Sequence, residues 1–71
     1  MFENLKAEMA RNNITIKTFS DDEELGLAYE TLRNKFRGKT EWVNREMRLI
    51  KNKYFPDKTL EYLFEWKEQE S

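Results

Sequence analysis

The chain has 71 residues and a formal net charge of −1, and it contains neither Cys nor His. These two absences exclude a disulfide framework, a thiolate metal site and a thiol nucleophile, and they argue against catalysis that depends on imidazole. We therefore expect one small domain that is not an enzyme, needs no cofactor and has no small-molecule substrate. Regular helix packing or oligomerisation is expected to compensate for its small core.

The charges are distributed unevenly along the chain. Residues 1–32 carry three basic and seven acidic side chains, residues 33–53 carry eight and two, and residues 54–71 carry two and five. Eight basic against two acidic side chains give the middle third a charge of +6. A basic segment of this size favours an anionic partner, with a solvated helix surface as the alternative explanation.

The N-terminal stretch MFENLKAEMARNN contains acidic residues and no long apolar run, so it is neither a signal peptide nor a membrane span. We expect a soluble, cytoplasmic protein without a membrane partner. With two Gly and one Pro in the chain, and no run in which apolar and polar residues alternate convincingly, the sequence gives no support to β-hairpins. It predicts an all-α fold, a compact bundle of about five short helices.

Apolar residues at helical spacing predict the first two helices. The first helix ends at the Asn12-Asn13 pair, and its apolar stripe consists of Phe2, Leu5 and Met9. Thr15 is expected to cap a second helix that begins at Ile16, because its hydroxyl can accept a backbone N–H bond.

The segment from Ser20 to Gly38 allows two interpretations. Ser20 and Glu23 form a capping-box pattern, which predicts one continuous helix from Asp21 to Arg37 that ends at Gly38. The apolar stripe of this helix would consist of Leu25, Ala28, Tyr29, Leu32 and Phe36. In the second interpretation Gly26 forms a sharp turn between two helices, because glycine tolerates a positive φ angle.

Two further helices are expected after Gly38. Asn44 is a candidate cap for the first of them, and Pro56 limits its C-terminal end. Its apolar face would consist of Val43, Met47, Ile50 and Tyr54. Asp57 is a candidate cap for the last helix, whose buried stripe would consist of Leu60, Leu63 and Phe64. We expect one domain over residues 1–66 and a frayed polar tail over residues 67–71. If Phe64 and Trp66 stay exposed, a dimer contact explains them.

Three stretches, NLKAEMARNNITIK, LGLAYETLRNKFRGKTEW and FPDKTLEYLF, resemble the Cro and phage-repressor type of helix-turn-helix family. The resemblance covers Phe2 to Phe64, and its best signature is Gly26 with Leu27 beside it and Leu32 further on. It implies a lambda-repressor-like helix-turn-helix domain. The implied function is that of a phage-type transcriptional regulator, which binds double-stranded operator DNA as a homodimer.

The resemblance also implies which side chains contact DNA. The outward positions of the second helix of the motif would face base edges, and they are Ala28, Tyr29, Glu30, Arg33 and Asn34. Arg33 can bridge two acceptors of guanine, and Asn34 can pair with adenine in the same bidentate way. Contacts to phosphates are expected from Lys17, Lys35, Arg37, Lys39, Arg45 and Arg48.

The residues before Gly26 depart from the family pattern. Asp22 occupies a position where the family usually has a small apolar residue, and burying an unpaired carboxylate is costly. A shift of two residues, which places Phe19 and Ser20 at the apolar and small positions, avoids that cost. It leaves an exposed acidic segment, Asp21, Asp22, Glu23 and Glu24, beside the DNA-binding helix. Such a segment suits an antirepressor-like modulator, so a repressor protein is the alternative partner to DNA.

Overall fold

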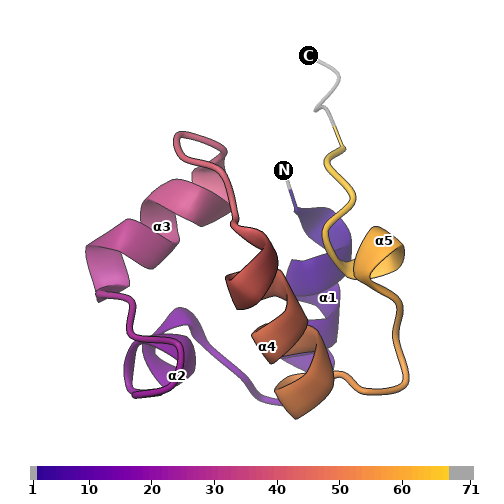
Figure 1. Cartoon of the computed structure of the whole chain (residues 1–71). Helices are drawn as coiled ribbons and strands as arrows, with labels where there is room; N and C mark the ends of the chain where they lie inside the picture. The colour runs from indigo at the N-terminus through magenta and orange to yellow at the C-terminus, as the bar shows by residue number, and fades with distance from the viewer. Residues whose placement is uncertain (1, 68–71) are drawn as a thin grey trace.

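The structure is a computed structural model and describes residues 2–67 (Figure 1). These residues form five helices and no strand: α1 (Glu3–Arg11), α2 (Ile16–Ser20), α3 (Tyr29–Arg37), α4 (Asn44–Tyr54) and α5 (Leu60–Leu63). The expected all-α class is therefore confirmed. Of the predicted tail, residues 68–71 lie outside the described residues. None of the helices within residues 2–67 has the length and apolar character needed to cross a bilayer.

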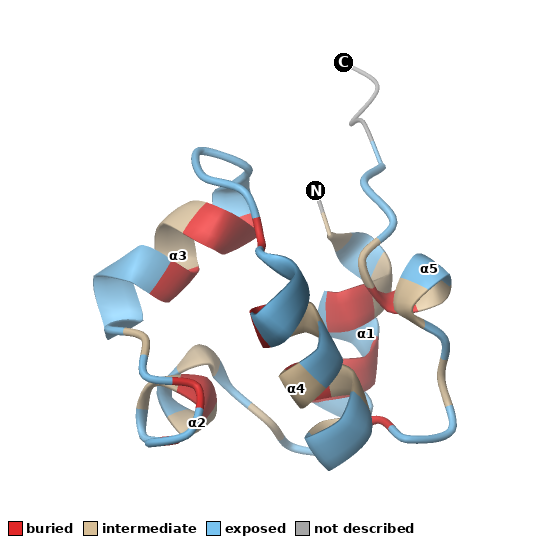
Figure 2. Cartoon of the chain, in the orientation of Figure 1, coloured by how far each residue is buried: buried red, intermediate tan, exposed pale blue. Residues whose placement is uncertain are grey.

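A single apolar core holds the helices together. α2 packs against α3, while α5 packs against both α1 and α4. In Figure 2 the buried positions of α3 lie on the side of the helix that is turned toward the middle of the molecule, and α1 also carries buried positions. The buried apolar side chains are Leu5, Met9, Phe19, Leu25, Leu32, Phe36, Trp42, Ile50, Phe55 and Leu63. The core thus draws on every helix and on the segments between them.

The helix between Asp21 and Arg37 is not continuous, so the first interpretation of that segment is wrong. α2 ends at Ser20, and residues 21–28, the α2–α3 connection, are not helical. Ser20 does not cap a following helix, since its hydroxyl donates to the Lys17 carbonyl oxygen at 2.8 Å. Gly26 has a φ of 65°, a conformation that glycine adopts without steric cost. α3 is therefore a separate helix, as the turn at Gly26 predicted.

Two of the predicted helix caps are displaced. The cap of α4 is Val43 rather than Asn44, and the Glu46 carboxylate accepts the Val43 backbone N–H at 3.1 Å. Val43 is consequently 50% exposed and does not belong to the apolar face of α4. At α5 the cap is Thr59 rather than Asp57, because residues 55–58 first form a turn after α4. The predicted caps at Thr15 and Gly38 are confirmed.

Candidate nucleic-acid interface

The solvent side of α3 carries most of the predicted base contacts. Leu32, Lys35 and Phe36 are buried on the opposite side of the helix. Residues spaced by three and four positions share a helix face, so Glu30, Arg33, Asn34 and Arg37 form the outward face of α3. Glu30 and Arg37 are exposed, and Arg33 and Asn34 are partly buried. This arrangement adds Arg37, which was predicted as a phosphate contact, to the side chains that face outward from α3.

The remaining base-contact candidates lie at the start of α3. Ala28 is the N-cap residue of the helix and is exposed, and the Tyr29 side chain is 48% exposed in the first turn. Arg33 and Glu30 form an ion pair at 3.6 Å. The five predicted base-contact residues therefore all lie on α3 and its N-cap. One of them, Glu30, places its carboxylate next to the Arg33 guanidinium.

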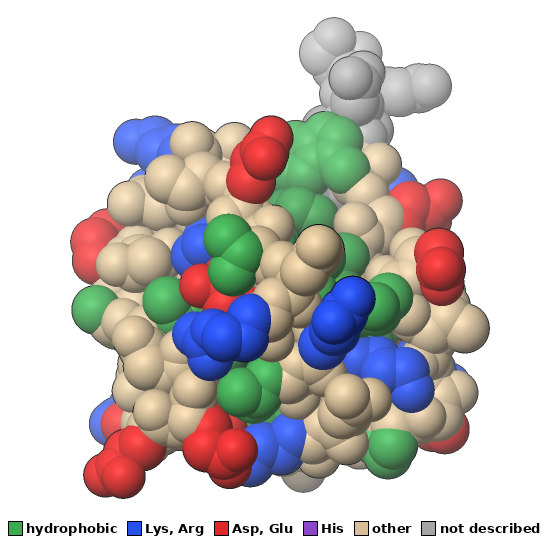
Figure 3. All heavy atoms as spheres, in the orientation of Figure 1, with side chains coloured by type: hydrophobic (Ala, Val, Ile, Leu, Met, Phe, Trp, Pro, Cys, Tyr) green, Lys and Arg blue, Asp and Glu red, His purple; other side chains and the backbone are tan. Residues whose placement is uncertain are grey.

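Three predicted phosphate contacts are exposed cations without a partner. Arg37, Lys39 and Arg48 make no ion pair or side-chain hydrogen bond within residues 2–67. Lys17 is also exposed, but it pairs with Asp21 at 3.3 Å. Figure 3 shows Lys and Arg side chains gathered over α4, with Asp and Glu mostly near the edges of the view. The surface thus has several cations that pair with no acidic group of the described chain.

Lys35 corrects the set of predicted phosphate contacts, because its side chain is buried. Its Nζ lies 2.9 Å from Oε1 of Glu46 and donates to the Glu41 carbonyl oxygen at 2.9 Å. The same Nζ lies 5.8 Å from the centre of the Trp42 ring. Position 35 falls between Leu32 and Phe36 on the inward side of α3, so the charge faces α4 instead of solvent. Lys35 joins α3 to α4 and is not available to a phosphate.

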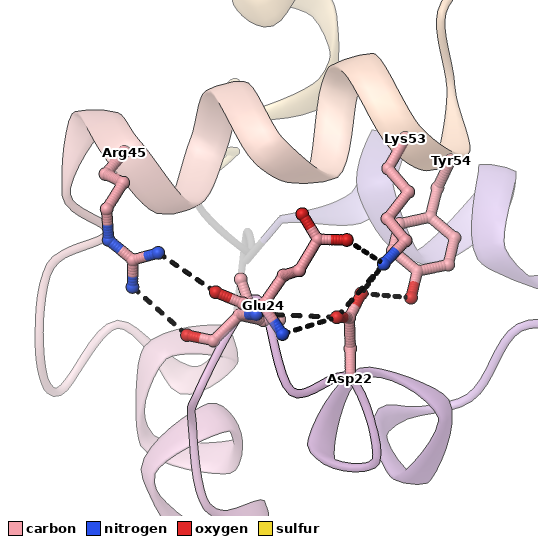
Figure 4. A network of polar contacts seen from close by, with 6 residues as sticks. Asp22, Glu24, Arg45, Lys53 and Tyr54 are labelled. Carbon is pink, nitrogen blue, oxygen red and sulfur yellow. Dashed lines mark hydrogen bonds and ion pairs between the residues drawn. The ribbon is translucent and has the colours of Figure 1, made fainter.

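Arg45, another predicted phosphate contact, binds the protein's own backbone. Its Nη1 donates to the Glu24 carbonyl oxygen at 3.1 Å, and its Nη2 donates to the Leu25 carbonyl oxygen at 3.1 Å (Figure 4). Both acceptors lie in the α2–α3 connection, just before Gly26. The guanidinium of α4 therefore fixes the chain where α3 is about to begin.

Asp22 is buried, so the prediction of an exposed side chain at this position is wrong. The Tyr54 hydroxyl donates to its Oδ2 at 2.6 Å, and the Lys53 Nζ lies 3.0 Å from the same oxygen. Its Oδ1 accepts the backbone N–H groups of Glu24 at 3.0 Å and Leu25 at 3.4 Å. An Asp that binds its own following backbone forms a turn, which explains why the chain is not helical here.

These contacts change the titration of the groups involved. The Tyr54 hydroxyl lowers the pKa of Asp22 most, and Lys53 and the two backbone N–H groups add to this effect, while burial opposes it. Burial and the neighbouring Asp22 carboxylate raise the pKa of Tyr54 to about 12. The carboxylates of Glu24 and Asp22 raise the pKa of Lys53 above its ordinary value. All three shifts favour a charged Asp22 beside a protonated Tyr54 and Lys53.

The acidic segment is largely paired within the chain. Asp21 pairs with Lys17, Asp22 with Lys53 and Tyr54, and Glu24 with Lys53 at 2.9 Å. Glu23 is exposed and makes no ion pair in the described part of the chain. Figure 4 shows Arg45 at one end of the resulting network and Lys53 and Tyr54 at the other, with Asp22 and Glu24 between them. Three residues of α4 therefore hold the α2–α3 connection in place.

Sequence reasoning missed the roles of Tyr54, Lys53 and Glu46. The sequence analysis placed Tyr54 on the apolar face of its helix and gave Lys53 and Glu46 no role. The signal that points to such partners is Asp22 itself, since a carboxylate at a position that the fold tends to bury requires donors.

Comparison with known proteins adds no relative to this description, because no protein-family model, curated protein or solved structure matches the chain. Within residues 2–67, moreover, no cluster of acidic side chains is arranged as a metal site. The arrangement is suited to contact through the polar surface of α3. The α2–α3 connection and α4 keep that surface in place.

Proposed function

We propose that the protein is a DNA-binding transcriptional regulator in which α2 and α3 form a helix-turn-helix. In this proposal α3 enters the major groove and presents Arg33 and Asn34 to base edges. The observation that carries the proposal is the separation of α3 from α2 by residues 21–28, which include Gly26, together with a polar outward face on α3. A continuous helix through Gly26 would have left no such element.

The fixed position of α3 supports the proposal. A helix that recognises bases must hold its side chains at a defined angle, because a loosely held group loses affinity to the cost of ordering it. Arg45, Lys53 and Tyr54 tie the α2–α3 connection to α4, and the buried Lys35–Glu46 pair ties α3 itself to α4. α3 is thus held at its N-terminal side and in its last turn.

The charges also favour DNA over a basic protein surface. Arg37, Lys39 and Arg48 are unpaired within the described residues and suit phosphates. In the acidic segment, by contrast, Asp21, Asp22 and Glu24 are paired with Lys17, Lys53 and Tyr54, and Glu23 alone is unpaired within the described residues. No contact within residues 2–67 therefore favours the alternative partner, a repressor protein bound through Asp21–Glu24.

The proposal can be tested by fluorescence anisotropy on DNA duplexes. A preferred duplex is first selected from a random-sequence pool, and binding is then measured at low and moderate salt on the selected and on a scrambled duplex. We expect the affinity to fall as salt rises. We expect Arg33→Ala to lose about tenfold or more in affinity for the selected duplex and little for the scrambled one, since a bidentate base contact is worth roughly 1–3 kcal/mol.

Lys6→Ala is the matched control, because Lys6 is an exposed cation on α1 whose side chain has no partner within residues 2–67. It removes the same charge as Arg33→Ala and should bind both duplexes almost as the wild type does. Absence of binding to any duplex, even at low salt, would overturn the proposal.

A further inference from the structure

A pocket lined mainly by aromatic side chains is formed by segments from both ends of the chain and from the turn between α3 and α4. Its volume is about 440 Å³, within the range of roughly 300–1,000 Å³ that is typical of small-molecule sites. Its lining includes the aromatic residues Phe2, Trp42, Phe64 and Trp66, together with Thr40 and Glu41. We call it the aromatic pocket. None of the residues proposed to contact DNA belongs to the lining.

The four aromatic rings meet at steep angles. The ring centres of Phe2 and Trp66 lie 5.1 Å apart with an interplanar angle of 76°, and those of Trp42 and Phe64 lie 5.4 Å apart with an angle of 67°. Rings in such an arrangement present their faces in several directions, and the face of an aromatic ring carries partial negative charge. Trp66 remains 46% exposed, so this wall of the pocket is open to a dissolved ligand.

Glu41 gives the pocket a negative charge. It is the only charged residue of the lining in the described part of the chain, and its exposed carboxylate has no ion-pair partner within residues 2–67. The backbone at this position is fixed, because the Lys35 Nζ donates to the Glu41 carbonyl oxygen at 2.9 Å. The Lys35 charge is itself compensated by Glu46 at 2.9 Å, and Lys39 does not line the pocket. A carboxylate beside aromatic faces favours a cation.

Trp42 adds a hydrogen-bond donor without an acceptor. The residue is only 8% exposed, and its Nε1 is the one buried side-chain nitrogen or oxygen within residues 2–67 that has no hydrogen-bond partner. An unpaired buried donor is costly, and native proteins normally provide an acceptor for it. Because Trp42 lines the pocket, a ligand that carries an oxygen acceptor would satisfy this donor.

We propose that the aromatic pocket binds a small molecule that carries a methylated ammonium group and, close to it, an oxygen acceptor. The cation lies against the ring faces with the Glu41 carboxylate as its counter-charge, and the oxygen accepts the Trp42 Nε1–H. A methylated ammonium suits such a site because its charge is surrounded by apolar methyl groups that pack against aromatic rings. This ligand site goes beyond the proposed function and does not depend on it.

The test is a fluorescence titration of the full chain without DNA. Trp42 and Trp66 are the two Trp residues of the chain and both line the pocket, so intrinsic Trp fluorescence reports on it directly. Choline chloride is the probe, and sodium chloride keeps the ionic strength constant. We expect a saturable change with choline. Neohexanol, in which carbon replaces the charged nitrogen of choline, should bind about tenfold more weakly or worse. Tetramethylammonium, which lacks the oxygen, should bind about threefold more weakly.

Two variants locate the binding site. Glu41→Gln should weaken choline binding about threefold, in keeping with the modest strength of an exposed ion pair. Glu23→Gln is its matched control, because Glu23 is also exposed and unpaired within the described residues but does not line the pocket. Trp66→Leu should weaken choline binding about fivefold or more, since it removes one of the ring faces. Circular dichroism checks that this variant stays helical.

The proposal would be overturned if choline gave no saturable change, or if neohexanol bound as tightly as choline. Equal affinities of choline for the wild type, Glu41→Gln and Trp66→Leu would overturn it as well, because the binding would then lie elsewhere on the protein. Neither DNA nor the outward face of α3 takes part in these measurements, so failure here is distinguishable from failure of DNA binding.

Discussion

Tyr54 on α4 donates a 2.6 Å hydrogen bond to the carboxylate of Asp22, 32 residues earlier in the chain. Together with Lys53, it stabilises a charged group at a buried position of the α2–α3 connection. The same carboxylate organises the backbone of Glu24 and Leu25, so a single side chain links α4 to the turn before α3.

This contact predicts how the free energy of unfolding depends on pH. The pKa of Asp22 is lowered from 3.8 in the folded protein, so its contribution is present above pH 3.8 and is lost as the pH falls through the lower folded pKa. At the alkaline end, Tyr54 contributes below its ordinary pKa of 10.0, and this contribution is lost as the pH rises toward about 12. Asp22→Asn should therefore lower Tm at neutral pH. The Tm of this variant should also decrease less on acidification than the Tm of the wild type.

Thermal unfolding followed by circular dichroism over this pH range checks the prediction. Tyr54→Phe removes only the hydroxyl and should cost about 1.5–3 kcal/mol at neutral pH, the usual range for a hydrogen bond to a charged group. Tyr29→Phe is the control, because Tyr29 is about half exposed and no hydrogen bond involves its hydroxyl within residues 2–67. An acid unfolding curve that is identical for Asp22→Asn and the wild type would contradict the assignment.

A second prediction separates the two arginines of α4. Arg48 is an exposed cation without a partner in the described chain, so Arg48→Ala should reduce the slope of log affinity against log salt by about 0.9, the value for one phosphate contact. Arg45 binds the carbonyl oxygens of Glu24 and Leu25. Arg45→Ala should therefore weaken binding to the selected duplex while leaving the salt slope unchanged.

Anisotropy titrations of both variants at several salt concentrations measure these slopes. If Arg45→Ala lowered the slope as much as Arg48→Ala, the original prediction of a phosphate contact for Arg45 would be correct. Arg45→Lys is a useful companion variant, because it keeps the charge but cannot reach two carbonyl oxygens with a planar pair of donors.

The third prediction concerns the buried pair between Lys35 and Glu46. Lys35→Met leaves the Glu46 carboxylate buried without its cation, which should cost roughly 3–5 kcal/mol of unfolding free energy. The double variant Lys35→Met/Glu46→Gln removes the stranded charge and keeps an acceptor for the Val43 N–H, so it should recover a large part of that loss. Urea denaturation of both variants and of Glu46→Gln alone gives the coupling energy. A double variant no more stable than Lys35→Met would argue against a paired, charged state.

The fourth prediction compares the two glycines with positive φ. A Cβ at Gly26 would lie 3.7 Å from its nearest neighbour, the Glu23 carbonyl oxygen, so Gly26→Ala should cost only the strain of a positive φ, roughly 1–2 kcal/mol. A Cβ at Gly38 would also displace the Trp66 ring. Gly38→Ala should therefore be more destabilising than Gly26→Ala, and the difference should disappear when both are made in a Trp66→Ala background. Persistence of the difference in that background would show that Trp66 is not its cause.

Local patterns in the sequence were sufficient for much of the helical layout. The apolar spacing of α1, the Thr15 cap and the stop at Gly38 depend on residues close together in the chain, and the structure confirms them. The same local rules failed at Ser20, because its capping box competed with a turn that Asp22 makes with its own backbone. The capping box favours a helix from Asp21, whereas the Asp22 side chain favours a turn. Lys53 and Tyr54 of α4 bind the Asp22 carboxylate and stabilise the turn.

The candidate site was harder to predict for a related reason. The exposed positions of α3 follow from helical periodicity, and the structure places them as expected. The burial of Lys35 and Asp22 does not follow from it, because a charged side chain is buried only where distant groups such as Glu46 and Tyr54 satisfy it. Periodicity describes one helix at a time and carries no information on which partner another helix supplies.

The α4 side chains that bind the α2–α3 connection affect the order of folding during translation. Arg45, Lys53 and Tyr54 all follow α3 in the chain, and they hold the residues that precede it. As the polypeptide leaves the ribosome, every residue of α2 and α3 emerges before these three side chains do. The nascent chain therefore contains all residues of the outward face of α3 before it contains the side chains that fix the position of this helix. These contacts are complete only after residue 54 has left the ribosome.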